Sequence, residues 1–123
     1  MLVLVCGDRK WTDSNFIRKT LLDLKLSLWN DKGEHITILQ GGAKGADLIA
    51  GQWGKDEHLE VIEVPAEWDL YGKRAGPIRN NEMLKMNPDL VIAFHNNIES
   101  SKGTKDMVYK ARKAGIKTII YSN

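Results

Sequence analysis

The stretch that most constrains the fold is residues 36–47, ITILQGGAKGAD. Its first four residues form a short β-branched and apolar run, which predicts a buried strand because the run is too short for a buried helix. Gly41, Gly42 and Gly45 predict a sharp turn, since glycine permits backbone conformations and close approaches that a Cβ would prevent. Apolar residues then recur at helical spacing through Trp53, so a helix is expected to begin near Gly45.

Such a turn is either a phosphate-binding loop or a plain connection. A strand, a glycine-rich turn and a helix in succession direct several backbone N–H groups and the positive end of the helix dipole toward one place, where phosphate is the usual occupant. A single Gly-Gly pair does not separate this interpretation from a tight connection that binds nothing. Under the first interpretation, the ligand-binding residues of this stretch are Gly41, Gly42, Ala43, Lys44, Gly45 and Asp47.

The remaining sequence alternates between strand and helix patterns. Strands are expected at residues 2–6, 36–39, 59–64, 89–94 and 117–121, with four helices between them. The first and fourth runs are apolar, as is typical of central parallel strands, whereas Glu60 and Glu63 place the third run at a sheet edge. We therefore predict one α/β domain over residues 1–123, with a Rossmann-like, doubly wound parallel sheet of five strands in the order 3-2-1-4-5 and helices on both faces.

This topology predicts the position of a ligand site. In open sheets of this kind, ligands bind at the carboxyl ends of the strands, where the strand order reverses. The first and fourth strands flank that point here. The same rim is therefore expected to bring together the glycine-rich turn and the residues Gly7, Asp8, Arg9, Gly103 and Thr104. Three glycine-bearing turns on one rim favour a binding site over a plain connection.

The segment 65–86 is the least ordinary part of the sequence. Its first half has the composition of a polar-aromatic loop, in which Trp68 either stacks on a base or closes the end of the core. A helix follows, and Arg79 in its first turn opposes the helix dipole. That position favours an arginine that binds an anion, with a solvent-exposed arginine as the alternative. Arg74 and Asn80 complete the ligand-binding residues expected here.

The first predicted helix carries two apolar stripes. One stripe is enough to cover a sheet. The second, formed by Leu22, Leu26 and Trp29, belongs either to a wide core-facing surface or to a contact between copies of the chain. A homodimer or higher homo-oligomer is the functional interpretation.

Composition excludes several classes of protein. The chain has 123 residues, 42% of them hydrophobic and 28% charged, as in ordinary globular domains. Its formal net charge of +2 argues against a protein that coats nucleic acid. No run approaches the length of a membrane span, and no signal peptide is evident. The single cysteine, Cys6, suits a reducing compartment, so a cytoplasmic location is expected.

Several motifs together resemble a known superfamily. They are Gly7-Asp8-Arg9-Lys10-Trp11, GGAKGAD at 41–47, PAEW at 65–68, GKRAGPIRNNEML at 72–84, AF at 93–94 and GTKDM at 103–107. This combination resembles the SLOG superfamily, and within it the small YspA-like (YpsA-related) branch. It is distantly similar to the LOG phosphoribohydrolases and to the DNA-uptake protein DprA. The resemblance implies a Rossmann-like sheet that binds nucleotides or nucleotide-derived ligands at the same rim.

The sequence departs from the superfamily pattern at two places. The family usually carries Pro-Gly-Gly after the fourth strand, where this chain has His95-Asn96-Asn97. The LOG enzymes carry a glutamate three residues after the threonine of Gly-Thr, and the matching residue here is Met107. Asp106 precedes that position by one residue, and it is expected to point elsewhere on the helix.

Three functions are consistent with these features. The first is binding of a nucleotide or nucleotide-derived ligand, as a sensor or a sequestering module. The second is an enzyme that cleaves an N-glycosidic or phosphoester bond, such as a phosphoribohydrolase-type hydrolase. Its candidate catalytic carboxylates are Asp8, Asp47, Glu82 and Asp106. The third is DprA-like binding of single-stranded nucleic acid, against which the weak net charge counts. No metal is expected, because the histidines lack ligand spacing, and no cofactor is assigned beyond a nucleotide-type ligand.

Overall fold

The computed structural model describes residues 1–123, and its centre is a five-stranded parallel sheet in the order β3-β2-β1-β4-β5. The strands are β1 (Leu2–Gly7), β2 (Thr37–Gln40), β3 (Val61–Glu63), β4 (Leu90–Phe94) and β5 (Lys117–Tyr121). Every neighbouring pair is parallel, which confirms the predicted strand order and direction. β3 lies at an edge as predicted, although it is shorter than the expected run 59–64.

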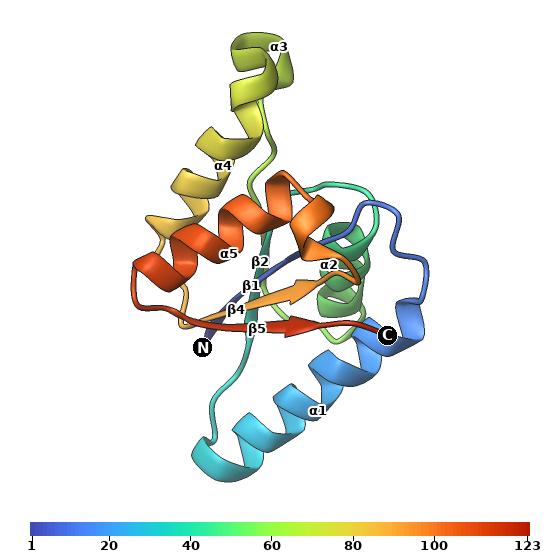
Figure 1. Cartoon of the computed structure of the whole chain (residues 1–123). Coiled ribbons are helices and arrows are strands. Elements are labelled where there is room, and N and C mark those ends of the chain that lie inside the picture. The colour runs from blue at the N-terminus through green and yellow to red at the C-terminus, as the bar shows by residue number, and fades with distance from the viewer.

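Helices cover both faces of this sheet (Figure 1). They are α1 (Ser14–Lys32), α2 (Ala46–Asp56), α3 (Trp68–Tyr71), α4 (Ala75–Leu84) and α5 (Gly103–Lys113), with the 3-10 helices η1 (Gly72–Arg74) and η2 (Ile98–Ser100). α1 and α2 pack together on one face, and α4 and α5 pack together on the other. The alternating side chains of β1 divide between two cores, with Val3 and Val5 in one and Leu4 and Cys6 in the other.

The register of the central strands sets up the carboxyl rim. All five residues of β4 are buried, as expected for a strand covered on both faces. Gly7 at the end of β1 pairs with Phe94 at the end of β4. The next residues, Asp8 and His95, therefore leave the sheet side by side at the point where the strand order reverses.

The second stripe of α1 is exposed. Leu22, Leu26 and Trp29 have exposed fractions of 37%, 50% and 53%, so the interpretation of this stripe as core is wrong. The core-facing stripe consists of Ile17, Leu21 and Leu28. The prediction of a contact between copies stays a prediction.

The first half of the segment 65–86 differs from the expected loop. Residues 68–74 form the short helices α3 and η1, which we call the arm. None of its residues is buried, and Figure 1 shows α3 projecting beyond the end of the sheet. Local N–H bonds from Leu70 and Tyr71 to the Glu67 carbonyl hold its one turn together, so no core contact is needed to form it. No helix in the chain has the length and apolar character needed to cross a membrane.

Candidate functional site

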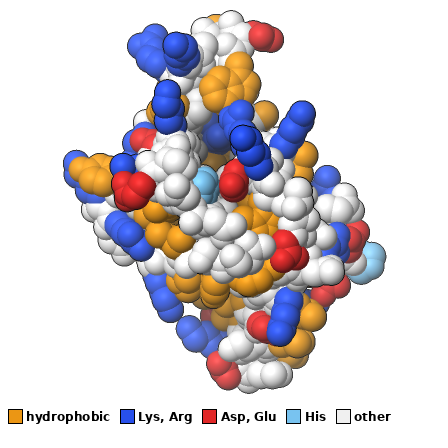
Figure 2. All heavy atoms as spheres, turned by 45° about the vertical axis from the view of Figure 1, so that its right-hand side comes forward, with side chains coloured by type: hydrophobic (Ala, Val, Ile, Leu, Met, Phe, Trp, Pro, Cys, Tyr) orange, Lys and Arg blue, Asp and Glu red, His pale blue; other side chains and the backbone are white.

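A hollow of about 320 Å³ lies at the carboxyl rim, between the glycine-rich turn, the end of β1 and the arm. Its lining consists of Arg9, Gly41, Gly42, Ala43, Lys44, Pro65, Ala66, Trp68 and Arg79. Figure 2 shows Lys and Arg side chains gathered around the upper part of this face of the molecule. Seven of these residues are ones that the sequence assigned to ligand binding, so the predicted rim is a real concavity with a basic lining.

The amides of the glycine-rich turn already have partners inside the protein. The Asp47 carboxylate, through Oδ2, accepts the N–H groups of Gly41 at 3.1 Å and Ala43 at 3.3 Å. The Gln40 side chain accepts the Gly42 N–H at 2.5 Å. The expectation that Gly41 and Gly42 offer their amides to phosphate therefore differs from the structure. A carboxylate of the protein occupies the position at which an anion was expected.

Two glycines of this turn make close contacts that a Cβ would disturb. A Cβ at Gly45 would lie 2.2 Å from the Asp8 carbonyl oxygen, and the φ of Gly45 is +79°, a value that other residues rarely adopt. A Cβ at Gly41 would lie 2.2 Å from the Arg79 guanidinium. The turn thus lets the end of β1 and the side chain of Arg79 pack directly on its backbone.

Arg79 joins the glycine-rich turn to α5. Its Nη1 donates to the Gly41 carbonyl at 2.7 Å, and its Nε donates to the Asn80 Oδ1 at 3.2 Å. The Asn80 amide in turn donates to the Gly103 carbonyl at 3.2 Å and to Asp106 at 3.1 Å. Arg79 is buried, so the alternative of a solvent-exposed arginine is wrong. Its nearest acceptor is a backbone carbonyl, while one edge of the side chain faces the hollow.

Burial shifts the pKa of three groups in the lining of the hollow or beneath it. Burial raises the pKa of Asp47 to about 6, although the nearby Arg79 and the two amide donors act in the opposite direction. Burial lowers the pKa of Arg79, and Asp47 partly opposes that shift. Burial also raises the pKa of the Cys6 thiol, so this core residue favours the protonated form over the thiolate that a nucleophile needs.

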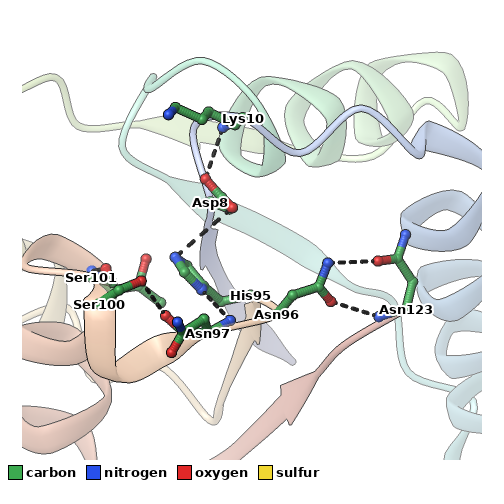
Figure 3. Close-up of polar contacts among 9 residues, drawn as sticks. Asp8, Lys10, His95, Asn96, Asn97, Ser100, Ser101 and Asn123 are labelled. Carbon is green, nitrogen blue, oxygen red and sulfur yellow. Dashed lines mark hydrogen bonds and ion pairs between the residues drawn. The ribbon is translucent and has the colours of Figure 1, made fainter.

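Asp8 and His95 face each other at the reversal point of the strand order (Figure 3). Their closest atoms, the Asp8 Oδ2 and the His95 Nε2, are 4.0 Å apart. The Asp8 Oδ1 accepts the Lys10 N–H at 2.9 Å, and the His95 Nδ1 accepts the Asn97 N–H at 3.0 Å. Asp8 thus lies beside the hollow rather than in its lining.

Some predicted residues lie apart from the hollow. Arg74 is an exposed residue of the arm and does not line it. Glu82 is exposed on α4, with no hydrogen bond or ion pair that would position it as a catalyst. Gly7 packs against Phe94 and Ala46, where it allows a close approach of β1. Gly103 is exposed, and the Thr104 N–H bonds to the Ser101 hydroxyl at 3.0 Å.

At the start of α5, Met107 and Asp106 point in different directions. Met107 is fully buried in the core between α5 and the sheet, so it cannot replace a rim glutamate. Asp106, one residue earlier, accepts a hydrogen bond from Asn80 and forms an ion pair with Lys110 at 3.0 Å. The carboxylate linked to the rim network is therefore Asp106.

Sequence reasoning assigned no role to Gln40. This side chain is 2% exposed and bridges the Gly42 amide and the Glu63 carboxylate. The sequence feature that could have identified Gln40 is a polar residue directly after a buried apolar run, at the carboxyl end of a strand. His95 carried the same signal after the fourth strand.

Comparisons with known proteins agree with this architecture. Residues 1–71 match the sequence profile described as the YspA, cpYpsA-related SLOG family. The Gene 61 protein of Mycobacterium phage D29 is 33% identical over 126 residues, covering 98% of this chain and 96% of that protein. The crystal structure of DNA processing protein A (DprA) from Streptococcus pneumoniae superimposes with a TM-score of 0.75 at 17% identity. That match covers 96% of this chain and 49% of the DprA chain, and it shows a shared fold.

Proposed function

Because this chain belongs to the YspA, cpYpsA-related SLOG family, whose domains generally bind nucleotide-derived ligands, we propose that it binds a nucleotide-derived anion in the rim hollow. Its role on this proposal is that of a sensor or sequestering module. The ligand's phosphate lies against the basic lining, and its base lies near Trp68.

The observation that carries this proposal is a set of three cations that line the hollow and form no ion pair within 4.0 Å. Arg9, Lys44 and Arg79 all line the hollow, and none of them is in an ion pair. Arg9 lies over the Trp68 ring, with its guanidinium carbon 5.4 Å from the ring centroid. Guanidinium groups match phosphate oxygens in charge and geometry, and an aromatic ring at the same place offers a stacking surface.

The glycine-rich turn contributes in a more limited way than a phosphate loop would. Asp47 and Gln40 take the amides of residues 41–43, whereas the amides of Lys44 and Gly45 have no acceptor in the chain. These two N–H groups lie next to the first turn of α2, where the helix dipole favours negative charge. Side chains therefore supply most of the affinity for the anion, and the turn supplies shape.

Isothermal titration calorimetry with AMP, ADP-ribose and NAD tests the proposal. We expect at least one to bind, and we expect Arg9→Ala to weaken it about tenfold or more, because a charge-assisted hydrogen bond contributes about 1.5–3 kcal/mol. Arg112→Ala, at an exposed position of α5, is the matched control and should bind as the wild type does. Equal affinities for Arg9→Ala and the wild type would contradict the site. Binding of single-stranded DNA alone would favour the DprA-like alternative.

A second candidate function is hydrolysis at the same hollow. Asp47 has a pKa raised to about 6 by burial, within the range that suits a general acid near neutral pH. It lies beneath the glycine-rich turn, where a ligand's phosphate or sugar would approach. Release of free base from a nucleoside monophosphate by the wild type, and its loss in Asp47→Asn, would favour this candidate over binding alone.

We also propose that the exposed stripe of α1 joins two copies of the chain. Leu22, Leu26 and Trp29 form an apolar surface on one helix, and such surfaces commonly mark interfaces. Light scattering should report more than a monomer, and Leu26→Asp should dissociate it. Leu70→Asp in the arm is the control, since Leu70 is also exposed but lies on another element. A monomeric wild type at high concentration would contradict this proposal.

A further inference from the structure

The pair formed by Asp8 and His95 leaves a gap that neither side chain closes (Figure 3). Their facing atoms are 4.0 Å apart, which is longer than a hydrogen bond. An oxygen atom placed about 2.8 Å from both atoms would subtend an angle of about 90° between them, close to the arrangement around a hydroxyl oxygen. One bridging oxygen would therefore reach both atoms at hydrogen-bond distance.

His95 offers a hydrogen-bond donor to this gap. The Asn97 N–H donates to its Nδ1, so Nδ1 is an acceptor. A neutral imidazole has one accepting and one donating nitrogen, which places the proton on Nε2, the nitrogen that faces Asp8. Asp8 offers the matching acceptor, because the Lys10 N–H uses only its Oδ1 and leaves Oδ2 without a hydrogen bond.

The gap opens onto the rim. The His95 and Asp8 side chains have exposed fractions of 9% and 31%. No fully buried side-chain nitrogen or oxygen in the structure lacks a hydrogen-bond partner. The His95 Nε2 has none, so this atom is reachable from outside.

We propose that Asp8 and His95 together bind the 2′- or 3′-hydroxyl of the ligand's ribose, so that the site discriminates against a nucleotide that lacks this hydroxyl. A hydroxyl is the simple group that accepts from one neighbour and donates to another. A phosphate is disfavoured, because the Asp8 carboxylate would repel it. Arg9 follows Asp8 in the chain and lines the hollow, so the sugar lies beside the phosphate subsite. This inference rests on the proposed function and names its ligand class.

Calorimetry with AMP, 2′-deoxy-AMP and 3′-deoxy-AMP tests the inference. We expect the wild type to bind AMP at least about tenfold more tightly than one of the two deoxy analogues, because a hydrogen bond to a charged acceptor is lost. His95→Phe keeps a ring of similar size and removes the Nε2–H group while Asp8 remains, so the preference for AMP should fall about threefold or more. The ratio of affinities is the readout, since a loosened loop would weaken all three nucleotides together.

The outcomes separate this inference from the proposed function. Binding of all three nucleotides by the wild type with less than tenfold discrimination would overturn the hydroxyl subsite and leave the nucleotide site standing. Retention of the full preference by His95→Phe would overturn the role of His95. Absence of binding by all three would remove the proposed site for nucleoside monophosphates, and this inference with it.

Discussion

The glycine-rich turn and the arm border the same hollow, but the protein holds them in opposite ways. The turn is fixed from beneath by Asp47 and Gln40, and the end of β1 packs directly on Gly45. The arm has no buried residue and is held by its own local hydrogen bonds. One wall of the hollow is thus part of the core, and the other stands outside it. On the proposed function, the turn would set the shape of the site, and the side chains of the lining would supply the affinity for the ligand.

The largest expected effect is on the free energy of unfolding, in two variants that each add one methyl group to one wall of the hollow. Gly45→Ala would place a Cβ 2.2 Å from the Asp8 carbonyl oxygen at a φ of +79°, and neither backbone can yield easily. Overpacking and backbone strain together should lower the free energy of unfolding by about 4 kcal/mol. Gly72→Ala in the arm has a φ of +58° but nothing within 4 Å. It should cost less than about 1 kcal/mol, because the arm can rearrange alone.

Urea denaturation of both variants measures this contrast. A Gly72→Ala variant that is destabilised as strongly as Gly45→Ala would show that the arm is an integral part of the fold. A mild effect of Gly45→Ala would show that the turn can move away from β1.

The same contrast explains how much the sequence could predict. Apolar runs and their interruptions by Glu60 and Glu63 predicted the strand order, because burial on one or both faces imposes those patterns directly. The arm was missed as a helix since four residues without core contacts leave no hydrophobic periodicity.

The sequence predicted at which end of the sheet the glycine-bearing turns lie, but not the hydrogen bonds that they form. Convergence of the three rim turns follows from topology alone. The Asp47 side chain folds back from the start of α2 and accepts the amides of the turn. The spacing of apolar residues in a helix does not predict the direction of such a polar side chain. Asp106 and Met107 show the same limit. One residue along a helix turns a side chain by about 100°, so Met107 lies in the core while Asp106 reaches the hydrogen-bond network of the rim.

The buried carboxylate of the turn should make stability depend on pH. Asp47 has a pKa of about 6 in the folded protein, above its ordinary value of 3.8, because burial disfavours its charge. The folded state therefore binds a proton more tightly than the unfolded state. The resulting cost, about 3 kcal/mol, is complete above about pH 6 and disappears as the pH falls toward 3.8. The wild type should gain stability relative to Asp47→Asn by about this amount between pH 7 and pH 4.

Asp47→Asn is a close match because its amide oxygen can still accept both turn N–H groups. Asp56 provides a control of opposite sign. Hydrogen bonds from Gln52 and Arg18 lower the pKa of Asp56 below its ordinary value of 3.8. Its contribution to stability is therefore present at pH values above 3.8 and is lost as the pH falls below that value. Chemical denaturation at a series of pH values measures both. Parallel profiles for the wild type and Asp47→Asn would contradict a buried, titrating carboxylate beneath the turn.

The smallest expected effect concerns the exposed wall. Trp68 is about half exposed, and its main polar contact is the Arg9 guanidinium over its ring. Trp68→Ala should change the free energy of unfolding by less than about 1 kcal/mol, the usual size of an exposed cation–π contact. It should nevertheless weaken nucleotide binding about threefold to tenfold, because the stacking surface and the support of Arg9 are lost together. Tyr109→Ala is the matched control, since Tyr109 on α5 forms a similar contact with Lys113 outside the hollow. Loss of affinity in both variants, or in neither, would show that the arm does not contribute to the site.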